Sequence, residues 1–188
     1  MESAQRSIED LVPNNADLVV SINSFESFKS ALKNTELVTK TTLFSPLTKV
    51  LKPLNSIQSK SPLLVCITRE SQENVFTFIT HLKNIKSKDS LLIPFVTVDS
   101  ILVASKSKES LDAILAQKKS NYSKIFKRRD ATATFSLYYK ALPALVCLSS
   151  IHVGAVFLDF NMTPESLTIN GTLLEEKSRN KCFKVFEK

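Results

Sequence analysis

The residue types that carry out acid–base and nucleophilic chemistry are scarce in this sequence. It has two histidines, His81 at the end of "FTFITHL" and His152 at the start of "HVGAVFLDF". A serine or cysteine nucleophile needs a base held beside it, and neither histidine lies near such a nucleophile along the chain. Asp159 is the one carboxylate inside an apolar strand-like segment, although strand alternation favours a water-facing side chain there. A hydrolase using Asp159 and His152 is therefore one alternative, and not the favoured one.

Motifs for phosphates and metals are missing from the sequence. Its glycines are Gly154 and Gly171, which are too few and too far apart for a glycine-rich phosphate loop. The three cysteines, Cys66, Cys147 and Cys182, are an odd number at wide spacing, which argues against a zinc site and a disulfide framework. One long-range disulfide stays open. We expect no small-molecule cofactor and no metal, and we predict that Cys66 and Cys147 are buried and not bridged to each other.

The strongest signal for binding is a basic segment with interleaved aromatic residues at 118–129. It contains no acidic residue, and the whole chain carries a formal charge of +7. Basic groups neutralise phosphates, and aromatic rings stack on bases. The partner in this interpretation is a nucleic acid, another polyanion or an anionic membrane surface. The candidate binding residues are Lys118, Lys119, Tyr122, Lys124, Lys127, Arg128 and Arg129.

The same segment has a simpler interpretation as an amphipathic helix. Tyr122, Ile125 and Phe126 have the spacing i, i+3 and i+4, which places them on one helical face. That face would pack inward and leave the basic residues in water. We favour this interpretation because a buried face requires this aromatic spacing.

The elements that position these residues alternate between strand and helix patterns. Residues 17–23 predict a strand, and Asn23 is a candidate N-cap of a helix that buries Phe25, Phe28 and Leu32. Further strands are predicted within 61–71, 73–82, 93–105 and 131–139, with a turn at Asp99-Ser100. A helix with Leu111, Ile114 and Leu115 on one face is predicted after residue 105, and another within 140–150. Residues 152–176 predict a hairpin, in which Leu167 and Ile169 alternate with the polar Thr168 and Asn170.

These elements predict an α+β fold in one domain over residues 1–188. We expect a mixed, largely antiparallel sheet with helices packed mainly on one face. The phrases "SFESFKSAL" and "SKESLDAIL" are similar, and "ATATFSLYYKALPAL" is a weaker third copy, which allows two pseudo-repeated halves, 1–117 and 131–188, joined by the basic segment 118–130. Shared helix-start chemistry without duplication explains the likeness equally well. The end "KCFKVFEK" predicts a short amphipathic helix that needs a partner surface, so we expect further domains to follow it.

Three segments carry a resemblance to a known group of proteins. Residues 8–34, "IEDLVPNNADLVVSINSFESFKSALKN", resemble the N-terminal region of large uncharacterised surface lipoproteins of Gram-negative bacteria. Residues 154–176, "GAVFLDFNMTPESLTINGTLLEE", are similar to a second phrase of that group. Residues 99–115, "DSILVASKSKESLDAIL", are similar to a phrase of a related bacterial domain of unknown function.

The resemblance implies a place in the cell envelope, as a periplasmic or outer-surface lipoprotein whose signal has been removed. This sequence shows neither the signal nor the lipid-acceptor cysteine, so a cytoplasmic location is the alternative. The leading hypothesis is a non-enzymatic structural or interaction module of an envelope protein. Its partner would be another protein or further domains of the same chain. Polyanion binding and hydrolysis are the two alternatives.

Overall fold

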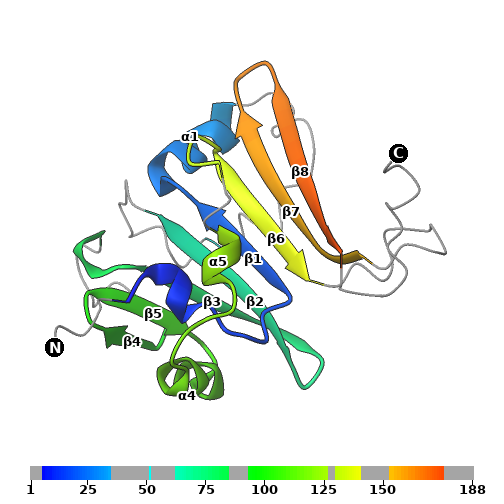
Figure 1. Cartoon of the computed structure of the whole chain (residues 1–188). Coiled ribbons are helices and arrows are strands. Elements are labelled where there is room, and N and C mark those ends of the chain that lie inside the picture. Colours follow the sequence, from blue (N-terminus) through cyan, green and yellow to red (C-terminus); the bar gives the residue numbers. More distant parts are fainter. Residues whose placement is uncertain are drawn as a thin grey trace, which may run out of the picture.

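The described part of the chain is built around one antiparallel sheet (Figure 1). The computed structural model describes residues 6–34, 51, 62–84, 93–126, 130–140 and 153–175. Its eight strands have the order β4-β5-β3-β2-β1-β6-β7-β8. The strands are β1 (Leu18–Ile22), β2 (Leu63–Glu70), β3 (Glu73–His81), β4 (Phe95–Val98), β5 (Ile101–Ser105), β6 (Phe135–Lys140), β7 (Val153–Met162) and β8 (Leu167–Glu175). The helices are η1 (Ile8–Leu11), α1 (Phe25–Asn34), η3 (Leu82–Asn84), α4 (Lys108–Ala116) and α5 (Ser123–Phe126).

The predicted α+β class is confirmed, with a correction to the sheet. Every pairing among the described strands is antiparallel, so the sheet is not mixed there. Strands joined by short turns, as in β2–β3, β4–β5 and β7–β8, can pair only in this way. The central strand β1 pairs with both β2 and β6, so the proposed halves 1–117 and 131–188 contribute to one continuous sheet.

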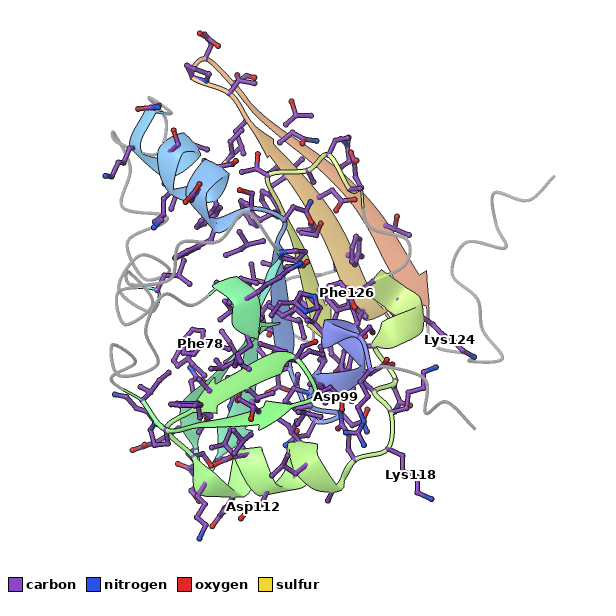
Figure 2. All side chains as sticks on the ribbon, turned by 90° about the vertical axis from the view of Figure 1, so that its left-hand side faces the viewer. Phe78, Asp99, Asp112, Lys118, Lys124 and Phe126 are labelled. Carbon is purple, nitrogen blue, oxygen red and sulfur yellow. The ribbon has the colours of Figure 1, made fainter. Side chains whose placement is uncertain are left out.

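Apolar side chains cover both faces of the sheet, because alternate strand residues point to opposite sides. On the first face, Val19, Cys66 and Tyr138 pack with residues of η1, α4 and α5. On the second face, Val20 and Phe135 pack with residues of α1. Figure 2 labels one aromatic residue of each cluster, Phe126 on the first face and Phe78 on the second.

The two similar phrases form strand–helix corners on opposite faces. The first becomes β1 and α1 on the second face, and the other becomes β5 and α4 on the first face. The described helices therefore lie on both faces. The predicted predominance on one face stays a prediction. The helix predicted within 140–150 lies outside the described residues except for Lys140, which ends β6.

The structure corrects the predicted N-cap of α1. Ser24, and not Asn23, caps α1, because its hydroxyl accepts a hydrogen bond from the Ser27 backbone N–H at 3.3 Å. Ser107 caps α4 in the same way, through the Ser110 N–H at 3.1 Å. Asn23 instead donates from Nδ2 to the carbonyls of Asp130 (3.4 Å), Ala131 (3.2 Å) and Ala133 (2.8 Å). It thereby joins the β1–α1 corner to the loop before β6.

Two tight turns connect strands without glycine. Ser71 and Gln72 form the β2–β3 turn with φ of 47° and 72°, in the left-handed region. Asp99 starts the predicted β4–β5 turn with φ of 53°. Non-glycine residues adopt these angles at a cost, which identifies the turns as strained points of the fold.

Two apolar residues are more exposed than their patterns predicted. Leu115 lies on α4 with Leu111 and Ile114, yet its side chain is 43% exposed while the other two are buried. Ile169 on β8 is 51% exposed, although the alternation placed it on a covered face. Both patterns identified the correct element, but neither shows how far the covering structure extends.

Candidate interaction site

The basic segment 118–129 is anchored by aromatic side chains that are buried in the core. Tyr122 is 3% exposed and Phe126 is 2% exposed, and Ile125 packs against the same core. The Tyr122 ring meets the Tyr138 ring edge to face, with centroids 5.1 Å apart. The Phe126 ring meets Phe157 of β7 at 6.0 Å. The amphipathic interpretation of this segment is therefore correct for its aromatic residues.

The burial of Tyr122 corrects its place among the candidate binding residues. Its hydroxyl donates to the Ala16 backbone carbonyl at 2.5 Å, so neither the ring nor the hydroxyl is available for stacking on a ligand. Burial also raises the pKa of Tyr122, and the neighbouring Tyr138 contributes to the rise. Tyr122 is thus a neutral anchor for the segment at physiological pH.

The lysines of the segment that the structure describes are exposed. Lys118 and Lys119 follow α4, and Lys124 lies on α5. Figure 2 shows Lys118 and Lys124 extending outward on the same side of the molecule. The remaining candidates, Lys127, Arg128 and Arg129, lie outside the described residues.

Amide side chains hold the backbone of this surface in place. Gln117 donates from Nε2 to the carbonyls of Asp10 (3.0 Å) and Val12 (2.9 Å). The Asn121 N–H donates to Asn14 Oδ1 at 2.9 Å. These contacts join residues about a hundred positions apart, so no local sequence pattern could reveal them. They give Lys118 and Lys119 a fixed backbone from which to reach solvent.

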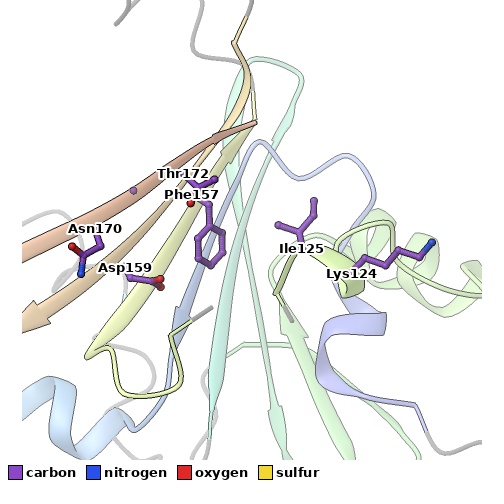
Figure 3. Close-up of a pocket in the computed structure, with 7 residues that line it drawn as sticks. Lys124, Ile125, Phe157, Asp159, Asn170 and Thr172 are labelled. Atoms are coloured by element: carbon purple, nitrogen blue, oxygen red, sulfur yellow. The ribbon is translucent and has the colours of Figure 1, made fainter. Parts of the chain in front are cut away.

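A cavity of about 280 Å³ lies between α5 and the β7–β8 hairpin. Phe157 and Ile125 face each other across it, and the Lys124 side chain extends away from it (Figure 3). Asn170 and Thr172 of β8 line the other side. The cavity has an apolar floor and a polar rim, and it lies beside α5 on the first face of the sheet. Sequence reasoning missed it, because it depends on how α5 packs against β7 and β8.

Asp159 lines the same cavity and is engaged in internal hydrogen bonds. Its carboxylate accepts from the Ser136 hydroxyl, and its Oδ2 accepts from the Asp130 N–H at 3.3 Å. The side chain is half-buried, and these bonds join β7 to β6 and to the loop that precedes β6. Its proposed partner His152 lies outside the described residues, so a pairing of the two stays a prediction.

Asp130 is itself held by local bonds. Its Oδ1 accepts from the Thr132 hydroxyl at 2.6 Å and from the Thr132 N–H at 2.8 Å. These bonds favour the ionised carboxylate and lower the pKa of Asp130 below its ordinary value. The loop next to Asp159 therefore carries a stable negative charge.

A wider hollow of about 440 Å³ lies between α4 and residues 13–15. Glu70 lines it and accepts from the hydroxyls of Ser107 (2.8 Å) and Ser110 (2.6 Å). The Glu70 carboxylate thereby fixes the first turn of α4 to the end of β2. We assign this cluster to the fold, because its carboxylate already has hydroxyl partners.

The one cysteine that the structure describes behaves as predicted. Cys66 is fully buried and its thiol is free, and burial raises the pKa of that thiol. Cys147 and Cys182 lie outside the described residues. In the described ranges, no three His, Cys, Asp or Glu side chains gather as a metal ion would require. None of the described helices has the length and apolar content to cross a membrane.

Comparisons with known proteins inform the fold and not the family. No protein-family model matches the chain, and no curated protein matches its sequence. The chain is similar to the solved structure of TP0453 in crystal form III, with a TM-score of 0.50 at 10% identity over 98% of this chain and 86% of that one. Crystal form I of TP0453 gives a TM-score of 0.50 at 11% identity, over 98% and 84%. At such low identity the likeness shows the fold alone.

Proposed function

We propose that the chain is a non-enzymatic interaction module of a bacterial cell-envelope protein. The observation that carries this proposal is the β7–β8 end of the sheet, which the described helices leave partly uncovered. Thr168, Asn170 and Thr172 are exposed there on one face, and Ile169 is 51% exposed on the other. A cavity with an apolar floor on one face of the strand and an exposed apolar residue on its other face are typical of surfaces that bind another molecule.

The polar contacts support a binding role over a catalytic one. The Asp159 carboxylate binds Ser136 and the Asp130 backbone, and Glu70 binds two serines at the start of α4. A general base must be free to take a proton from a substrate. These two carboxylates instead stabilise the fold, so the hydrolase alternative would require a rearrangement of this site.

The envelope location and the partner are further parts of the proposal. They derive from the resemblance of residues 8–34 and 154–176 to the surface lipoprotein group. In this view the partner is another envelope protein or a later domain of the same chain. We also propose the finer architecture that the strand and helix patterns of the sequence predicted, with helices mainly on one face of the sheet and two related halves.

Position-dependent cross-linking in cells tests this function. A photoreactive amino acid is placed at Asn170 or Thr172 in the native gene product, and at Asp112 of α4 as a control. All three positions are exposed, and Asp112 lies at the other end of the molecule (Figure 2). We expect discrete products in the envelope fraction from the β8 positions and none from Asp112. Equal yields at all three positions, no products, or a purely cytosolic protein would contradict the proposal.

Polyanion binding is a second candidate function, favoured by one specific observation. Lys118, Lys119 and Lys124 are exposed on a segment that Tyr122 and Gln117 hold in place. Each phosphate contact that is lost should make the slope of log K against log salt concentration shallower by about one. The three lysines are changed together to glutamate, and retention on heparin is measured against salt.

A matched variant controls for net charge. Lys33, Lys83 and Lys106 are also exposed, on other elements, and changing them to glutamate alters the total charge equally. Loss of retention only in the variant of Lys118, Lys119 and Lys124 supports a binding surface. Equal loss of retention in both variants would show that net charge alone explains the retention, and it would exclude this second function.

A further inference from the structure

Among the described residues, the outer edge of β8 has backbone groups without a partner strand, and the hydrogen bonds identify which groups these are. The Thr163 N–H donates to the Ser166 carbonyl at 2.9 Å, which sets the phase of the β7–β8 ladder. Bonded and non-bonded pairs alternate in an antiparallel ladder. With the observed register, Thr168, Asn170 and Thr172 bond to β7, and Ile169 and Gly171 direct their N–H and C=O groups outward.

A second hydrogen bond gives the same assignment independently. The Lys140 N–H donates to the Asp17 carbonyl at 2.8 Å, so alternate residues of β6 face β1 and the others face β7. Continuing this alternation through β7 leaves Ile169 and Gly171 facing away from the sheet. No described strand pairs with this edge.

In the part of the chain that the structure describes, the β8 edge lacks the features by which sheets protect their edges. Such edges are usually short, charged, bulged or interrupted by proline. The other edge strand, β4, is short, with 4 residues. By contrast β8 has 9 residues, and the stretch 167–174 contains no charged residue and no proline. Its exposed Ile169 adds an apolar contact to the open backbone groups.

From these observations we infer that β8 pairs with β8 of a second copy of this chain. This inference rests on the proposed function and names the partner of the same surface. The two strands run antiparallel about a two-fold axis, so one continuous sheet spans both copies. In the register centred on Asn170, Ile169 of each copy lies opposite Gly171 of the other.

The sequence of β8 is complementary to itself in this register. Ile169 and Gly171 share one face of the sheet, and Gly171 has no side chain to oppose the isoleucine of the other copy. On the other face the two Asn170 side chains meet, and amides both donate and accept hydrogen bonds. Residues 167–173 of the two copies face each other in this register, and none of them is charged, so two chains of charge +7 can approach there without like charges opposite each other.

Sedimentation of the full chain over a range of concentrations tests the inference. Ile169→Pro removes an outward N–H without removing a bond to β7, and Ile169→Lys places a charge on the edge. Leu115→Lys is the matched control, since Leu115 is the other large apolar residue that is exposed in the described ranges, at 43%. Circular dichroism checks that each variant is folded.

We expect a reversible dimer for the wild type and for Leu115→Lys. Each Ile169 variant should raise the dissociation constant by at least about tenfold. A wild type that stays monomeric at every concentration overturns the inference, as does a dimer that tolerates both Ile169 variants or is equally weakened by Leu115→Lys. A monomer would leave the cross-linking test of a different partner unaffected, so the two proposals fail separately.

Discussion

The Tyr122 hydroxyl offers a direct test of how the basic segment is anchored. It donates to the Ala16 carbonyl at 2.5 Å, and both residues are buried. Tyr122→Phe keeps the ring and its contact with Tyr138, and removes only the donor. A buried acceptor that loses its partner costs about 1–3 kcal/mol. The free energy of unfolding should therefore fall by about 2 kcal/mol.

Urea denaturation followed by circular dichroism measures this change. With a slope of about 2 kcal/mol per molar urea, the midpoint should fall by about 1 M at an unchanged slope. Tyr139→Phe is the control, because Tyr139 is half-buried on the second face of the sheet. Its effect should stay within about 0.5 kcal/mol. Equal midpoints for Tyr122→Phe and the wild type would refute the anchoring role.

Three further predictions concern the rest of the fold. Burial raises the pKa of the Cys66 thiol, so the unfolded chain loses this proton at a lower pH than the folded chain. The free energy of unfolding should therefore fall above about pH 9, by about 1.4 kcal/mol per pH unit. Cys66→Ala should flatten that part of the pH profile, and an unchanged profile would contradict this. Changing Ser71-Gln72 to Asn-Gly should raise the free energy of unfolding by about 1–2 kcal/mol, because both residues have left-handed φ; a loss of stability in urea would argue against that turn. Asn23→Ala should cost about 2 kcal/mol by removing the bonds to the loop before β6, and a urea midpoint equal to the wild type would contradict this role.

Local patterns were sufficient to predict most of the described strands. The β-branched and aromatic residues of β2 and β3 predicted a hairpin, and the structure turns at Ser71-Gln72 between them. The spacing of Phe25, Phe28 and Leu32 predicted the buried face of α1. These features depend on residues close in sequence, where periodicity is informative.

The errors come from contacts between distant segments. Asn23 had the sequence pattern of an N-cap, yet its amide binds carbonyls more than a hundred residues away. The exposure of Leu115 and Ile169 depends on how far other elements reach over them. Strand order also depends on long-range pairing, which places β6 beside β1. Periodicity carries no information on such contacts.

The spacing of the aromatic residues in the basic segment correctly predicted which of its side chains are buried. Tyr122, Ile125 and Phe126 pack inward, as the helical spacing indicated, and this removed Tyr122 from the binding residues. The cavity beside β7–β8 could not be predicted, because Phe157 and Ile125 are brought together only by the fold.

The most direct test of the interaction surface is amide exchange along β8. Residue-resolved hydrogen exchange is measured by mass spectrometry on the full chain at low concentration, where copies are separate. The N–H groups of Ile169 and Gly171 should exchange fast, and those of Thr168, Asn170 and Thr172, which bond to β7, should exchange slowly. At high concentration Ile169 and Gly171 should also become protected. Equal protection of all five residues at low concentration would contradict an open edge.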